Sequence, residues 1–175
     1  MASSRNPLPI PEIGERLRAQ FGDDVGDVAD QHGHAVLTVA ASRYREVTQV
    51  LRDDPEYALD YFDFVTAVDF PDRGEFEVVT HLWSTTLGHH VRLKVHVPRD
   101  EPVCPTISDI YPGANWAERE VWELFGITFE GHPHLVKLVL PEPFEGHPLR
   151  KDFVLMSREA KPWPGAPEGE EVEEE

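Results

Sequence analysis

Apolar side chains recur at helical spacing in two segments of the N-terminal half of the chain. The first segment carries Ile13, Leu17 and Phe21 on one face, which predicts a short amphipathic helix after a proline-rich leader. The second begins at Ser42, which we expect to cap a helix, and ends near Pro55, because the residue before a proline disfavours helical geometry.

A third helix is predicted at residues 115–125, after a connecting segment at residues 98–112 that is rich in proline. We expect Asn115 to cap this helix, with Glu118 three residues later as the acidic member of a capping box. Gly126 is placed to end it.

Strand-like segments fill the intervals between the helices. The clearest is residues 89–97, where valine and leucine alternate with histidine, arginine and lysine, so that one face is buried. Short turn-forming links predict mostly antiparallel pairing with helices on one face. The expected strands are residues 25–32, 35–40, 59–70, 75–85 and 89–97. The predicted fold class is therefore α+β: a two-layer domain of helix, two strands, helix and three strands with a mixed sheet, followed by a helix and an extended C-terminal arm.

These patterns divide the chain into four regions. Residues 1–9 form a flexible leader, residues 10–130 the α+β domain, residues 131–167 an extended arm and residues 168–175 a disordered acidic tail. The arm contains seven prolines, too many for regular structure of its own, yet it also carries many apolar side chains. We expect it to wrap a partner, and favour this over folding back onto the domain.

Charge and cysteine content exclude several classes of protein. The 175 residues carry a formal net charge of −17, which argues against binding to nucleic acid or to an anionic membrane surface. A single cysteine, Cys104, excludes an intrachain disulfide and a tetra-cysteine zinc or iron–sulfur site built from this chain alone. No stretch approaches the roughly 20 apolar residues of a membrane-spanning helix, so we expect membrane association only through partners.

Potential metal ligands are most concentrated around His132 and His134, which lie close in sequence to Glu118, Glu120 and Glu123. The spacing matches no zinc motif, and we favour structural roles for these histidines. An enzyme alternative, a stand-alone metal hydrolase using this group, predicts stoichiometric zinc or manganese in the isolated protein.

The tripeptide Gly-His-Pro occurs twice, at residues 131–133 and 146–148. We call each copy an elbow, because glycine permits unusual backbone angles, proline restricts its own φ and the histidine before it is held extended. The charged residues 150–152 follow the second elbow, and they either dock on a partner or are solvated.

Residues 118–133 read EREVWELFGITFEGHP and are followed by LVLP at 138–141 and FEGHPLRKDF at 144–153. This set closely resembles the signature of the C subunit of bacterial NADH-quinone oxidoreductase, a hydrophilic peripheral-arm subunit of respiratory complex I. The order of predicted elements extends the resemblance, more weakly, over residues 10–155. The family usually has Asp where this chain has Glu123, and a basic pair where it has Val136 and Lys137.

The resemblance implies a scaffold subunit with no cofactor of its own, while FMN and iron–sulfur clusters in partner subunits carry electrons from NADH to quinone, coupled to proton translocation. The implied partners are the quinone-site large subunit (the D subunit) and the neighbouring iron–sulfur proteins (the B and I subunits). The implied location is peripheral, at the cytoplasmic side of the cell membrane. Two further alternatives stay open: the equivalent subunit of a related membrane-bound hydrogenase or other donor dehydrogenase, and a free-standing protein-binding adaptor.

The residues that match the signature are, by this resemblance, structural or partner-interface residues with no catalytic, cofactor-binding or metal-binding role. They are Glu118, Arg119, Glu120, Gly126, Gly131, His132, Pro133, Gly146, His147, Pro148, Arg150, Lys151 and Asp152.

Overall fold

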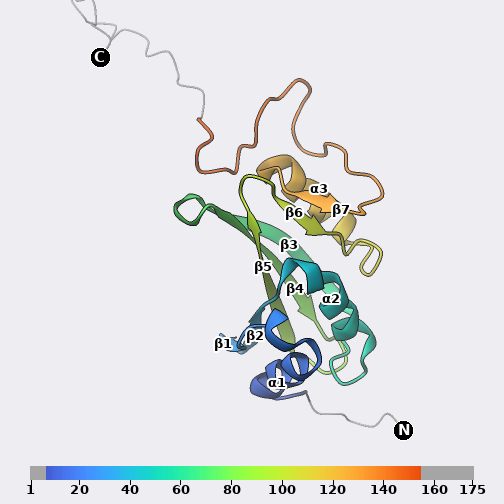
Figure 1. Ribbon diagram of the computed structural model, residues 1–175. Helices are drawn as coiled ribbons and strands as arrows, with labels where there is room; N and C mark the ends of the chain where they lie inside the picture. Colours follow the sequence, from blue (N-terminus) through green and yellow to red (C-terminus); the bar gives the residue numbers. More distant parts are fainter. Residues whose placement is uncertain (1–6, 155–175) are drawn as a thin grey trace, which may run out of the picture.

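Five strands form a mixed sheet in the order β1-β2-β5-β4-β3 in this computed structural model, which describes residues 7–154 (Figure 1). Neighbouring strands are antiparallel except for the parallel pair β2–β5, so the predicted mixed α+β fold is confirmed. The strands are β1 (Ala29–Gln31), β2 (His34–Thr38), β3 (Tyr61–Phe70), β4 (Glu75–Trp83) and β5 (His90–Pro98).

Three helices accompany the sheet, and each extends over a segment with helical periodicity. They are α1 (Ile10–Phe21), α2 (Tyr44–Asp53) and α3 (Ala114–Phe125), joined by the short 3-10 turns η1 (Gly22–Asp24), η2 (Ala41–Arg43) and η3 (Pro71–Arg73). Gly22 and Gly126, both at positive φ, follow α1 and α3, as the sequence predicted for Gly126.

Both predicted side-chain caps are wrong. Ser42 lies inside η2, and Asn115 lies in the first turn of α3, whose N-cap is Gly113. The preceding turns supply backbone acceptors instead: the N–H of Tyr44 bonds to the carbonyl of Ala41, and that of Asn115 to the carbonyl of Pro112. With these N–H groups satisfied, no side-chain oxygen is needed.

A second, two-stranded sheet was not predicted. Strands β6 (Val103–Pro105) and β7 (Thr128–Glu130) pair in parallel and bring together the two ends of the segment that contains α3. Each has only three residues, too few for an alternating pattern to be recognised, and β6 ends at a proline.

The apolar core lies on the helix side of the five-stranded sheet. Alternate residues of β5, from Val91 to Val97, point into it and are at most 1% exposed, which confirms the predicted alternation. The same cluster includes buried side chains of all three helices, among them Leu17, Leu51 and Val121. None of the strand residues on the opposite face belongs to this cluster.

The described part of the arm, residues 131–154, passes around α3 without forming a helix or strand (Figure 1). In this single chain the arm contacts α3 of its own domain, and the wrapping of a partner stays a prediction. Residues 1–6 of the predicted leader, residues 155–167 of the arm and the acidic tail lie outside the described residues.

Candidate functional site

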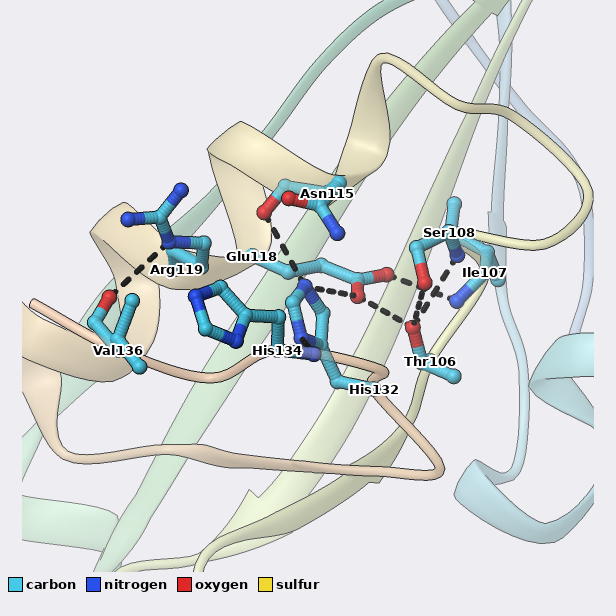
Figure 2. Close-up of polar contacts among 9 residues, drawn as sticks. All are labelled: Thr106, Ile107, Ser108, Asn115, Glu118, Arg119, His132, His134 and Val136. Carbon is cyan, nitrogen blue, oxygen red and sulfur yellow. Dashed lines mark hydrogen bonds and ion pairs between the residues drawn. The ribbon is translucent and has the colours of Figure 1, made fainter. Parts of the chain in front are cut away.

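The helix that carries the family-like signature, α3, is joined to the segment before it by a buried carboxylate (Figure 2). Glu118 is fully buried and accepts a hydrogen bond from the Thr106 hydroxyl at 2.5 Å and one from the Ile107 N–H at 2.7 Å. Burial raises the pKa of Glu118 to about 7, although both hydrogen bonds act in the opposite direction. This carboxyl holds the turn after β6 against the middle of α3.

The first elbow places His132 on the same helix. Its Nε2–H donates to the carbonyl of Asn115 at 3.2 Å, while its Nδ1 accepts the N–H of His134 at 3.1 Å. Both ring nitrogens are thus occupied as in a neutral imidazole. Burial lowers the pKa of His132, which also favours the neutral ring. The Nε2 of His132 lies 3.9 Å from the carboxylate of Glu118 (Figure 2). His132 is therefore a structural contact between the elbow and α3.

Arg119 binds the backbone of the next part of the arm. Its guanidinium donates to the carbonyls of Val136 and Lys137 at 3.0 and 3.2 Å and lies over the ring of Trp116, 5.6 Å from the centroid. A single side chain thereby connects two arm carbonyls to a tryptophan that is itself 64% exposed.

Three successive backbone N–H groups of the arm converge on Glu123. Those of Leu138, Val139 and Leu140 each donate to its carboxylate at 2.8 Å. Desolvation acts to raise the pKa of Glu123, but the three hydrogen bonds outweigh it and the pKa is lowered. Glu123, the position where the resembled signature usually has Asp, thus binds the arm of its own chain.

The second elbow and the two residues after it donate hydrogen bonds to backbone carbonyls at the C-terminal end of α3. The His147 ring Nδ1, the Leu149 N–H and the Arg150 Nε donate in that order to the consecutive carbonyls of residues 123–125, at 2.8, 3.1 and 2.5 Å. Without these donors, the last carbonyls of the helix would have no partner. The positive charge of Arg150 also interacts favourably with the negative end of the helix dipole. Arg150 in addition lies over the ring of Phe76.

The glycines of this region have positive φ: 76° at Gly126, 82° at Gly131 and 86° at Gly146. A Cβ at Gly126 would lie 2.4 Å from Arg150 Nη2 and 2.6 Å from His147 Nε2. Gly126 is therefore required both to turn the chain and to let the second elbow approach α3. The prolines of the two elbows, Pro133 and Pro148, are exposed and half-buried, respectively.

A network of charges anchors the end of the described arm to the sheet. Arg99 forms a two-point ion pair with Asp69 at 2.8 and 3.0 Å and binds Asp152 at 2.9 Å. The N–H of Lys151 donates to the same Asp69 at 2.8 Å. The arm is thus fixed at both of its elbows and at residues 150–152.

Four charged groups of the signature make no polar contact. Among the described residues, the side chains of Glu120, Glu130, Glu145 and Lys151 have no hydrogen-bond or ion-pair partner, and all four residues are exposed. Exposed apolar side chains lie in the same part of the molecule, on α3 and the arm: Trp116, Val136, Val139, Leu149 and Val154. Intrachain contacts therefore occupy most of the signature, while exposed charged and apolar side chains of α3 and the arm remain at the surface.

No group of three or more His, Cys, Asp or Glu side chains in residues 7–154 is arranged to hold a metal ion. The hydrolase alternative required His132 and His134. Both ring nitrogens of His132 contact backbone groups, whereas His134 is bonded through its backbone. Cys104 is fully buried, and burial raises the pKa of its thiol. These contacts give the hydrolase alternative no geometric support.

Sequence reasoning missed several residues that complete this site. Asp69 and Arg99 lie far from α3 in sequence, Thr106 lies 12 residues before Glu118, and no local pattern marks any of the three. Glu123 was considered as a potential metal ligand and as a departure from the family, although its position one turn after Arg119 on α3 is the feature that places it beside the arm.

Comparison with known proteins places this arrangement in a family. Residues 37–159 match the family described as "Respiratory-chain NADH dehydrogenase, 30 Kd subunit". The chain is 42% identical, over 146 residues, to the C subunit of NADH-quinone oxidoreductase from Roseiflexus sp. (strain RS-1), covering 83% of this chain and 84% of that protein. It is also 39% identical, over 168 residues, to the fused C/D subunit of NADH-quinone oxidoreductase from Citrobacter koseri, covering 91% of this chain and 28% of that longer protein.

Two solved structures share the fold at 28% identity. One is a trypsin-resistant fragment of Nqo5, with a TM-score of 0.60 over 71% of this chain and 97% of that one. The other belongs to the membrane-bound sulfane sulfur reductase, an archaeal respiratory membrane complex, with a TM-score of 0.64 over 83% of this chain and 85% of that one.

Proposed function

Since this chain belongs to the family of the 30 kDa subunit of respiratory-chain NADH dehydrogenase, which includes the C subunit of bacterial NADH-quinone oxidoreductase, we propose that it acts as a scaffold without redox chemistry of its own. Membership makes it a peripheral-arm subunit of respiratory complex I. In the proposal, FMN and iron–sulfur clusters of other subunits carry electrons from NADH to quinone, with coupled proton translocation. This chain then holds the quinone end of that module in position and supplies no catalytic residue.

The observation that supports the scaffold role is that most polar side chains of the signature bind their own chain, while others stay exposed. Glu118, Arg119, His132, His147 and Arg150 all bind atoms of this same chain. Such contacts build a shape, and in the described part of the signature they leave no convergent set of free polar groups of the kind an active site needs. What remains outward is a mixed apolar and charged surface of the kind that subunit interfaces use.

We propose the quinone-site large subunit, the D subunit, as the principal partner on this surface. The fused C/D protein of Citrobacter koseri supports this choice, because fusion keeps two chains together in one assembly. The iron–sulfur proteins, the B and I subunits, are proposed as further neighbours. No helix within residues 7–154 has the length and apolar character to cross a membrane. On the basis of family membership, we propose that the chain is held at the cytoplasmic side of the cell membrane through these partners.

The test is purification of the tagged full chain from gently solubilised membranes. We expect the flavin, iron–sulfur and quinone-site subunits to co-purify and the eluate to reduce quinone with NADH. Recovery of the chain alone, or with proteins that bear no redox centre, contradicts the proposal and favours the free-standing adaptor.

One second candidate has support from a specific observation, the likeness to a chain of the sulfane sulfur reductase complex. It is the equivalent scaffold role in a related membrane complex with another electron donor. The same purification separates the two: co-purified subunits of a different donor module, with no NADH-dependent quinone reduction, favour the related complex.

A further inference from the structure

The face of the sheet opposite the helices carries a continuous group of rings, which we call the ring patch. It extends over the ends of β2, β3, β4 and β5 that lie away from the η3 turn (Figure 1). Its members are His34, Tyr61, Phe64, His81, Trp83, His90 and Arg92.

The rings of the patch contact one another directly. His90 stacks between His34 and Trp83, with ring centroids 4.6 and 5.6 Å away, and the Trp83 ring is only 5° from parallel. His81 meets both other histidines edge-on and shares a 3.1 Å hydrogen bond with His90. Tyr61 packs on Trp83 at 5.6 Å and is 48% exposed. The patch is thus an ordered, partly apolar surface.

Arg92 lies in this patch without a carboxylate. Its only hydrogen-bond contact in the described chain is a long one, 3.5 Å from Nη2 to His81 Nδ1, and its Nε is buried with no partner. Burial, reinforced by the nearby Arg92, lowers the pKa of His81 to about 4, so this histidine is neutral at pH 7. Asp63 raises the pKa of His81 somewhat but forms no ion pair with Arg92. The patch therefore presents one uncompensated positive charge.

The other end of the same face is different, because its charges are already paired. Lys94 binds Glu77 at 2.9 Å, and His96 lies 3.1 Å from Glu75. The whole chain has a net charge of −17, yet Arg92, which lies on this face among the rings, has no carboxylate partner in the described chain. Arginine, tyrosine and tryptophan together are the composition of protein-interface hot spots.

The patch also adjoins the surface proposed above for the D subunit. A hollow beside β3 is lined by Phe64 and Thr66 of the sheet together with Glu120, Leu124 and Leu149 of α3 and the arm. Phe64 belongs to both, so the two surfaces meet at this hollow.

From these contacts we propose that the ring patch is a second subunit interface, which binds an acidic protein segment of a neighbouring subunit by placing a carboxylate on Arg92 and apolar side chains against Tyr61 and Trp83. A carboxylate there would accept N–H groups from the terminal nitrogens of the Arg92 guanidinium. The inference rests on the proposed scaffold role and adds a surface that the family signature does not include.

The first experiment places a photo-crosslinking amino acid at Tyr61 in the full chain and illuminates the purified complex. We expect a crosslink to another subunit, mapped by mass spectrometry to a segment that contains Asp or Glu. The same probe at Trp116 tests the proposed function separately. A Trp116 crosslink to another subunit with no interchain crosslink from Tyr61 overturns the ring-patch inference and leaves the scaffold role intact.

The second experiment reverses charge. Arg92→Glu is expected to lower the amount of chain in the assembled complex at least fivefold, whereas Arg73→Glu is the matched control, because Arg73 is exposed on η3 at the far end of the sheet. Thermal melts of the isolated full chain show whether either variant is misfolded. Replacing the crosslinked carboxylate of the partner by Lys is expected to restore assembly of Arg92→Glu.

Two results overturn the inference. One is equal assembly of Arg92→Glu and Arg73→Glu. The other is a Tyr61 crosslink that maps to residues 168–175 of the same chain and disappears when these residues are deleted, since the patch would then bind the acidic tail of its own chain.

Discussion

Individual residues of α3 serve purposes that their positions along the helix do not reveal. Glu118 lies where a capping-box acid belongs, yet its carboxyl binds Thr106 and Ile107. Gly126 ends the helix as glycine commonly does, yet it also makes room for His147 and Arg150. At this scale the tertiary neighbour, and not the local pattern, decides what a side chain binds.

Glu118→Gln tests the buried carboxyl. The folded-state pKa of Glu118, about 7, exceeds the ordinary value of 4.5, so the folded protein binds more protons than the unfolded one between these pH values. The free energy of unfolding contributed by Glu118 therefore falls as pH rises from about 4.5 to 7. We expect the difference in stability, wild type minus variant, to decrease by roughly 1–3 kcal/mol over this range. Urea denaturation at several pH values measures it, and a constant difference would contradict the assignment.

Gly126→Ala tests the close approach of the second elbow. Gly88 has the same φ of 76°, but a Cβ there meets nothing within 4 Å, which makes Gly88→Ala a matched control for backbone strain alone. We expect Gly88→Ala to cost about 1 kcal/mol and Gly126→Ala roughly 1–3 kcal/mol more, because His147 and Arg150 must move. Equal melting temperatures of the two variants would refute the steric role.

At the scale of elements, α3 is the helix to which the arm is hydrogen-bonded along most of its path. Residues 131–154 have no helix or strand, so their backbone groups rely on side chains and carbonyls of α3. Arg119 and Glu123 bind the arm along the helix, and the second elbow binds its C-terminal carbonyls. A proline-rich segment obtains a defined path in this way without secondary structure of its own.

Glu123→Ala is expected to release the middle of the arm. Loss of hydrogen bonds to a charged acceptor, each contributing about 1.5–3 kcal/mol, should speed hydrogen exchange at Leu138, Val139 and Leu140 by about tenfold or more. Glu145→Ala, which removes an exposed carboxylate elsewhere in the arm, should leave these amides unchanged. Exchange followed by NMR or mass spectrometry distinguishes the two. Unchanged protection in Glu123→Ala would show that the arm is held by its other contacts alone.

For the whole molecule, the helix side of the sheet forms the core, and we propose that two outward surfaces bind partners. One surrounds α3 and the arm, and the other is the ring patch on the opposite face of the sheet. A scaffold subunit needs a stable fold together with surfaces on more than one side. The distinction between a residue that builds the fold and one that faces a partner is therefore testable.

Glu120→Lys and Arg150→Glu make that distinction. Arg150 binds the end of α3, so its charge reversal should lower both the melting temperature of the isolated chain and the assembly of the complex on native gels. Glu120 has no partner in the described chain, so its reversal should lower assembly and leave the melting temperature within about 1–2 °C. Normal assembly with Glu120→Lys would remove this residue from the proposed interface, and normal assembly with lost turnover in Arg150→Glu would indicate a direct chemical role.

The sequence alone determined the three helices and the five strands of the larger sheet, because helix and strand periodicity depend on residues close together along the chain. The alternation in β5 and the glycines that end α1 and α3 are of this kind. The signature, with its two elbows, also sufficed to identify the family. Only the tertiary structure decided that β2 pairs in parallel with β5, that β6 meets β7, and that Thr106, Asp69 and Arg99 hold the signature in place. These pairings join residues far apart in sequence, and which of many possible partners a polar group binds depends on the packing of the whole chain.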